Sequence, residues 1–109
     1  MYDYMLENTN PEYVFFEMDV YWVVRGQQSP VDYFNNYKGR FLLLHIKDNK
    51  ELGQSGMVGF DAIFKNTDTA GVEHLVVEVE KYNFTPIESV QKSLDYLLNC
   101  SLVKETYIK

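Results

Sequence analysis

Phe41-Leu-Leu-Leu-His-Ile-Lys-Asp48 is the stretch of sequence that decides the fold. The run is too short to span a membrane and too apolar for a strand with one wet face. It therefore predicts a strand buried on both faces, as in parallel sheets covered by helices. His45, Lys47 and Asp48 would lie at the carboxyl end of this strand, which is where α/β folds bind ligands. A binding site is expected at that end.

Composition limits the classes of protein that fit. The chain has 109 residues, 46% of them hydrophobic, which predicts one small domain over residues 1–109. Its net charge of -6 offers no basic surface for nucleic acid. A single cysteine, Cys100, rules out an internal disulfide framework. The sequence shows no signal peptide and no apolar run of membrane-spanning length, so we expect a cytoplasmic protein without membrane contact.

Strand and helix patterns alternate along the chain after a short N-terminal helix at residues 2–7. Strands are predicted in the first part of 14–24, at the opening stretch, and at 74–80. Helices are predicted from Ser29-Pro30 and from Thr85-Pro86, where a serine or threonine cap precedes proline, and from Phe60, where apolar residues recur at helical spacing. The last helix is expected to bury Ile87, Val90, Leu94, Leu97 and Leu98. Strand–helix alternation predicts an α/β fold with a parallel sheet and right-handed crossovers.

Residues two apart on a strand share a face, and one parity of each strand becomes ionisable toward its end. The three sets are Phe15, Glu17, Asp19, Tyr21; Phe41, Leu43, His45, Lys47; and His74, Val76, Glu78, Glu80. Because parallel strands align their carboxyl ends, Asp19, His45 and Glu78 are expected to converge. Two carboxylates and an imidazole suit a divalent cation such as Mn, Co, Zn or Mg.

Each of these residues also has a structural interpretation. His45 could be a hydrogen-bonded core histidine, and Glu78 and Glu80 could be edge or surface charges. Glu17 could be half exposed without a role. Trp22 could stack on a ligand or pack in the core. Convergence favours the site, because ionisable groups on a buried face are costly unless they are paired or bind metal.

Four segments resemble sugar phosphate isomerases/epimerases of the xylose-isomerase-like TIM-barrel superfamily. They are Phe16-Glu-Met-Asp-Val-Tyr-Trp22, Leu44-His-Ile-Lys-Asp48, Gly53-Gln-Ser-Gly56 before Phe60-Asp-Ala-Ile-Phe64, and Val77-Glu-Val-Glu80. The resemblance implies a (β/α)8 barrel with a divalent metal held by two glutamates, an aspartate and a histidine. Asp19, His45 and Glu78 match three of these ligands. Glu78 also matches the glutamate that transfers a proton in a reaction that passes through an enediolate.

The resemblance also implies a sugar or sugar phosphate as substrate. We expect Trp22, Lys47, Asp48, Glu17 and Glu80 to contact it. Trp22 stands where epimerase members often carry a histidine, which separates this chain from that pattern. An endonuclease-like member is disfavoured, because two histidines and a charge of -6 suit neither several metals nor a polyanion.

Length is the larger departure, since a barrel of this type needs about 250 residues. The three βα units match the last part of such a barrel, so the sequence predicts a C-terminal fragment that lacks one catalytic glutamate. Whether this chain is active alone and binds metal stays open. The open edges and the inner-face residues Phe15, Phe41, Leu43 and Val76 predict a homo-oligomer. The alternative function is an inactive, self-associating binding or assembly module.

Overall fold

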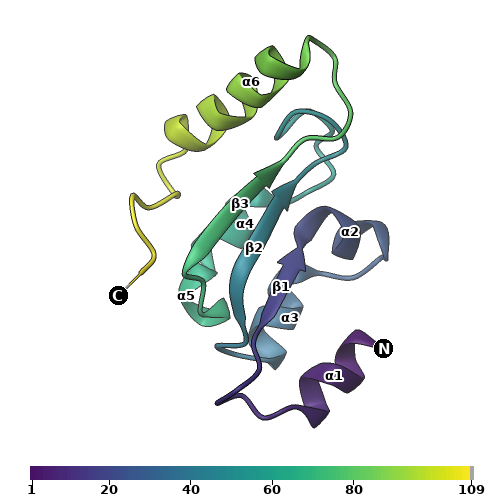
Figure 1. Cartoon of the computed structure of the whole chain (residues 1–109), viewed down its shortest axis with the longest axis vertical. Coiled ribbons are helices and arrows are strands. Elements are labelled where there is room, and N and C mark those ends of the chain that lie inside the picture. Colours follow the sequence, from purple (N-terminus) through teal and green to yellow (C-terminus); the bar gives the residue numbers. More distant parts are fainter. Residues whose placement is uncertain (109) are drawn as a thin grey trace.

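A computed structural model describes residues 1–108 and shows an α/β fold with a three-stranded parallel sheet in the order β1-β2-β3 (Figure 1). The strands are β1 (Phe16–Asp19), β2 (Phe41–Lys47) and β3 (His74–Glu78). The helices are α1 (Tyr2–Asn8), α2 (Val20–Arg25), α3 (Pro30–Asn36), α4 (Phe60–Lys65), α5 (Thr67–Ala70) and α6 (Pro86–Asn99). These elements confirm the predicted α/β class and the N-terminal helix. Within residues 1–108, none of the helices has the length and apolarity that crossing a membrane requires.

The core lies on one face of the sheet, between the central strand and the helices drawn behind it in Figure 1. Met18, Leu44 and Ile46 are buried on this face together with Phe34 of α3 and Phe64 of α4. Burial of each such side chain stabilises the fold by about 1.5–3 kcal/mol. The opposite face, which carries the ionisable residues, is only partly covered.

An irregularity in the β1–β2 register places Phe41 on the opposite face of β2 from Leu43 and His45, with which it was grouped in the sequence analysis. Phe16 pairs with Phe41, but the next residue, Glu17, pairs with Leu43, so β2 has one residue more than β1 at this point. Such a bulge reverses the alternation of side chains. Phe41 is fully buried, with its ring centroid 5.6 Å from that of Phe34 in α3. The prediction that Phe41 shares the exposed inner face was therefore wrong, whereas Phe15 and Val76 are exposed.

The first and third strands are shorter than predicted. The first strand ends at Asp19, and Val20 begins α2 instead of continuing the alternation to Tyr21. The Asp19 side chain accepts a hydrogen bond from the backbone N of Trp22, so it is the N-cap of α2. The third strand ends at Glu78, two residues before Glu80.

The apolar face of α6 was assigned wrongly. Of the five residues predicted to be buried, Leu97 alone is buried, and the helix instead turns Ser89 and Ser93 inward. Ser93 Oγ accepts a hydrogen bond from the backbone N of Leu52, in the loop that follows β2. α6 therefore packs on that loop through Ser93 and on the hydrophobic core through Leu97 and Tyr96.

Hydrogen bonds and packing contacts hold the loop after β2 in place. Glu51 accepts hydrogen bonds from the backbone and side-chain nitrogens of Asn83. Burial alone would raise the pKa of Glu51, but these hydrogen bonds outweigh it and lower the pKa below its usual value. Gly53, at φ +81°, lies against the ring of Tyr96 in α6.

Replacing Gly53 with alanine should lower the free energy of unfolding by about 2–4 kcal/mol, from left-handed backbone strain plus overpacking. The new Cβ would lie 2.6 Å from Cε2 of Tyr96, so the ring would have to move. Gly56→Ala is the matched control: its φ is +69°, but a Cβ there meets no described heavy atom within 4 Å. Urea unfolding of both variants should show the larger loss for Gly53→Ala. Equal losses would contradict the proposed packing of the loop on α6.

Candidate metal centre

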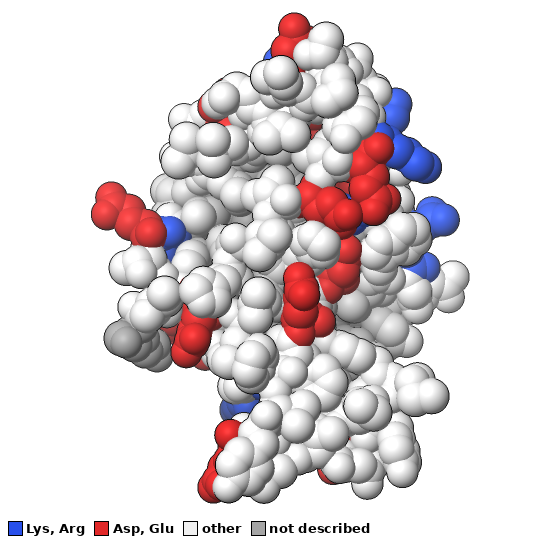
Figure 2. Space-filling model, in the orientation of Figure 1, with Lys and Arg blue, Asp and Glu red and all other residues white. Residues whose placement is uncertain are grey.

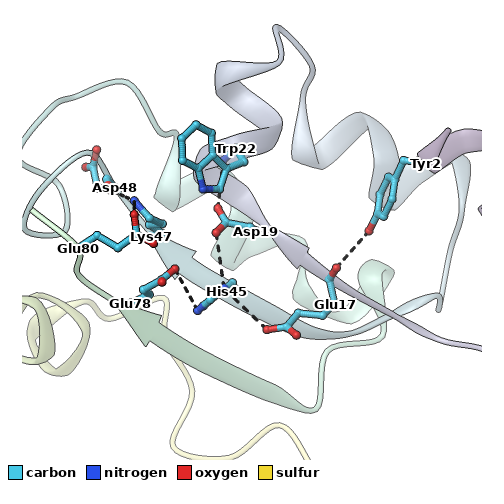
Figure 3. A network of polar contacts seen from close by, with 9 residues as sticks. All are labelled: Tyr2, Glu17, Asp19, Trp22, His45, Lys47, Asp48, Glu78 and Glu80. Carbon is cyan, nitrogen blue, oxygen red and sulfur yellow. Dashed lines mark hydrogen bonds and ion pairs between the residues drawn. The ribbon is translucent and has the colours of Figure 1, made fainter.

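His45 lies at the centre of a group of carboxylates where the three strands end (Figure 3). Its Nδ1 is 3.5 Å from Oδ2 of Asp19, on β1, and its Nε2 is 3.4 Å from Oε2 of Glu78, on β3. All three side chains are partly buried. The structure thus brings together the three residues that the sequence predicted as metal ligands.

The two carboxylates reach His45 in different ways. Asp19 is the direct partner of His45 in the β1–β2 ladder, whereas the strand partner of His45 on β3 is Val76. Glu78 lies two residues further along, on the same face, and its longer side chain returns to the imidazole (Figure 3). A histidine on the central strand is therefore flanked from both sides.

The cap of α2 orients Asp19. Its Oδ1 accepts the backbone N–H of Trp22 at 3.0 Å, which leaves Oδ2 facing His45. A carboxylate at a helix N-terminus also benefits from the helix dipole. The aspartate is consequently held in place before any ligand binds.

Glu17 is a further carboxylate beside the imidazole. Its Oε1 is 3.8 Å from Nδ1 of His45, and its side chain is half exposed. Pairing with His45 sets Glu17 apart from an isolated surface charge, although its substrate contact stays a prediction.

The pKa of Glu78 is raised above its usual value. Burial is the main cause, and a hydrogen bond that protonated Glu78 donates to Glu80 and the charge of Glu80 add to it, while the charges of His45 and Lys47 lower the pKa. A carboxyl group whose pKa lies closer to neutrality is better suited to pass a proton in both directions.

Lys47 is buried beneath two aromatic rings. Its Nζ lies 4.4 Å from the ring centroid of Tyr21 and 5.5 Å from that of Trp22. It is also 3.7 Å from Oε2 of Glu80 and donates a hydrogen bond to the carbonyl of Asp48. The Lys47 ammonium group thus links Tyr21 and Trp22 of α2 to Glu80, which follows β3 two residues after Glu78.

Asp48 is buried in the loop after β2, whereas Trp22 is half exposed beside the carboxylates. Asp48 is buried, and its carboxylate accepts hydrogen bonds from the backbone of Asn49 and Gly53 and from the hydroxyl of Ser55. It therefore holds the loop after β2. The indole of Trp22 is half exposed and borders the carboxylates. Substrate contact by either residue stays a prediction.

A hollow of about 330 Å³ adjoins the carboxylates on the β1 side. Glu17, Asp19 and Trp22 line it, together with Tyr2 and Tyr33, which sequence reasoning did not single out. Burial raises the pKa of Tyr2, and Tyr33 adds to the rise, so its hydroxyl stays neutral; it donates to the Glu17 carbonyl. No sequence signal connects Tyr2 to the site, because the contact depends on how α1 folds back.

The donor set fits a divalent cation. One ligand atom each from Asp19, His45 and Glu78 lies within 4.8 Å of the others. Carboxylate oxygen and imidazole nitrogen are the donors that Mn, Co and Zn use in proteins. Two donors around one tetrahedral ion stand about 3.4 Å apart, and Nε2 of His45 and Oε2 of Glu78 have this separation. Figure 2 shows that acidic side chains gather on this part of the surface.

Two solved structures resemble this chain. Both are crystal structures of a sugar phosphate isomerase/epimerase from Parabacteroides distasonis, with TM-scores of 0.89 and 0.87 and sequence identities of 46% and 44%. The chain is similar to the sugar phosphate isomerases/epimerases. No protein-family model matches it, and no curated protein sequence does.

The similarity covers 94% of this chain but only 36% and 37% of the two neighbours. The chain therefore spans about a third of the length of each of these two neighbours. The predicted resemblance and the partial-barrel fold class are both confirmed. The three strands form an open parallel sheet that corresponds to a portion of such a fold.

Proposed function

We propose that this chain supplies part of the active site of a divalent-metal-dependent sugar phosphate isomerase/epimerase. Asp19, His45 and Glu78 would hold the ion, and Glu78 would also transfer the proton. The observation that carries this proposal is the convergence of the three side chains within 4.8 Å on neighbouring parallel strands. The similarity to proteins described as sugar phosphate isomerases/epimerases supports the class of substrate.

When bound, a divalent ion would act as a Lewis acid on substrate oxygens. Glu78 would take a proton from the carbon beside a substrate carbonyl and return it, which suits its partly buried carboxyl and its raised pKa. Asp19 would keep its position through the α2 cap. Lys47 would hold the Glu80 carboxylate in place near Glu78.

The sugar phosphate would occupy the hollow beside β1. Glu17 and Trp22 line it and are positioned to contact the substrate, and Asp19 borders it from the metal side. Its volume lies at the lower end of small-molecule pockets. Because the chain covers about a third of its neighbours, a fourth ligand and the remaining substrate contacts would come from further polypeptide.

A chimaera tests this function directly. This chain would replace the matching segment of the Parabacteroides distasonis protein, and the unmodified protein would serve as the positive control. We expect turnover of a sugar phosphate, followed by NMR in deuterated water, that is lost on chelation and restored by Mn, Co, Zn or Mg. A folded chimaera without turnover, or one whose turnover survives chelation, would refute the proposal.

A further inference from the structure

The hollow beside β1 has aromatic walls. Tyr2, Trp22 and Tyr33 line it, and they come from α1, α2 and α3. The Tyr2 ring packs edge-on against that of Tyr33, with 5.5 Å between the ring centroids, so each ring holds the other in place. The indole of Trp22 is 54% exposed and lies beside Asp19 (Figure 3). Aromatic rings of this kind offer flat apolar surfaces on which the C–H face of a sugar can pack.

Hydrogen-bonding groups complete the hollow. Glu17 and Asp19 present carboxylate oxygens, which accept hydrogen bonds from hydroxyl groups. Gln28, in the turn between α2 and α3, also lines the hollow, and its carboxamide can both donate and accept. The residue before it, Gln27, is the one non-glycine residue within 1–108 whose φ is positive, at +61°. Left-handed backbone at a non-glycine residue costs stability and is concentrated at ligand sites.

The charged side chains that line the hollow are carboxylates. Of the residues 1–108 that the structure describes, none of those lining it is a lysine, an arginine or a histidine. An adjoining smaller hollow is lined by Asp3 and Asp32, which add negative charge. The charge of a divalent ion held by Asp19 and Glu78 would be balanced by those two carboxylates, so Glu17 would still leave the hollow negative.

This charge pattern suits a hydroxyl group and opposes a phosphate. A phosphate ester carries a charge of about -1.5 to -2 at neutral pH, and proteins bind it with arginine, lysine or backbone N–H groups. In this hollow it would meet the carboxylates of Glu17 and Asp19 without a cation. A hydroxyl group carries no charge and donates a hydrogen bond to the same carboxylates.

We propose that the hollow binds the uncharged, polyhydroxylated end of the substrate, so that the phosphate of a sugar phosphate stays outside it. The inference rests on the proposed function for the class of substrate, and it adds the direction in which the substrate enters. The hollow meets the three candidate metal ligands at Asp19, whose Oδ2 lies 3.5 Å from Nδ1 of His45. The group that binds the phosphate would then belong to the further polypeptide.

Mannitol and its phosphate esters test this direction, because the two ends of mannitol are identical and none of these compounds has a carbonyl group that can react. Trp22 is the single tryptophan of the chain and lines the hollow, so one indole N–H signal in a proton–nitrogen NMR spectrum reports binding there. The titrations are done on the 109-residue chain with EDTA present, so that they report the hollow and not a bound ion.

We expect mannitol to shift the Trp22 signal. The monophosphate should bind within about threefold of mannitol, because it keeps one free end and its charge is screened outside the hollow. The bisphosphate, with a phosphate at each end, should bind at least about tenfold more weakly than mannitol, because like charges would face each other. A bisphosphate that binds as tightly as mannitol, or a Trp22 signal that mannitol leaves in place, would overturn the proposal.

Two charge variants separate the hollow from the charge of the whole chain. Glu17→Gln removes a carboxylate that lines the hollow, so it should narrow the gap between mannitol and the bisphosphate at least about threefold. Glu12→Gln is the control, since it removes the same charge from an exposed residue outside the hollow and should keep the gap. Gaps of equal size in the two variants would show that the hollow does not select against phosphate.

Turnover of the chimaera decides the proposed function separately. An active chimaera, together with a bisphosphate that binds the chain as tightly as mannitol, would support the proposed function and overturn the direction of entry. An inactive chimaera, together with the expected preference for mannitol, would refute the proposed function and support a hollow that selects an uncharged, polyhydroxylated ligand.

Discussion

Replacing Glu78 with glutamine is expected to lower the turnover of the chimaera by about 10³-fold, within the range that general acid–base catalysis supplies. Glutamine keeps the size of the side chain and an oxygen donor, but it cannot accept and return a proton. The partly buried position of Glu78, next to Nε2 of His45, would be preserved. The measurement is kcat together with exchange of the substrate proton for solvent deuterium.

Glu80→Gln is the matched control for this variant. Glu80 lies two residues further on, is about half exposed, and pairs with Lys47. Its replacement removes a carboxylate from the same neighbourhood but leaves the pair of Glu78 and His45, so we expect less than about a tenfold loss. Full turnover in Glu78→Gln, or losses of the same size in both variants, would remove Glu78 as the proton carrier.

The convergence at His45 could be predicted because it depends on two regularities that tertiary structure rarely overrides. Strands of successive βα units run parallel with their ends aligned, and side chains alternate along each strand. Asp19 pairs directly with His45, as both rules require. Glu78 is offset by two residues, and an offset of two keeps it on the same face. The predicted convergence therefore holds even though Glu78 is two residues out of register with His45, because an even offset leaves both side chains on the same face of the sheet.

The errors have local physical causes. The first strand ends at Asp19 because the Asp19 carboxylate caps α2. The alternation of side chains along the strand does not indicate whether a residue will continue the strand or cap a helix. The bulge before Glu17 removed Phe41 from the inner face, and a bulge leaves no mark in the pattern of apolar residues. In α6 four of the five residues that were predicted to be buried form an apolar stripe that faces outward. Its direction was set by Ser93 and Tyr96 packing on a loop.

Replacing His45 with alanine is expected to weaken binding of Mn, Co or Zn to the 109-residue chain by at least about 100-fold, since even loss of an outer-shell partner can cost 10–100-fold. His45 offers the nitrogen donor of the triad and separates Asp19 from Glu78. Without it, the remaining donors are carboxylates that repel one another. The visible spectrum of bound Co and calorimetric titration measure the loss independently.

His74→Ala is the control, because His74 is the other histidine of the chain. It lies at the opposite end of β3, on the same face, and pairs with Leu43 two residues before His45. The spacing of a strand places it about 7 Å from the level of the triad, so its loss should change the metal affinity less than about twofold. If both variants bind metal equally well, the ion is held by exposed carboxylates and the imidazole contributes nothing. If His45→Ala alone loses the metal, the central strand supplies the ligand that distinguishes this site from a cluster of acidic residues.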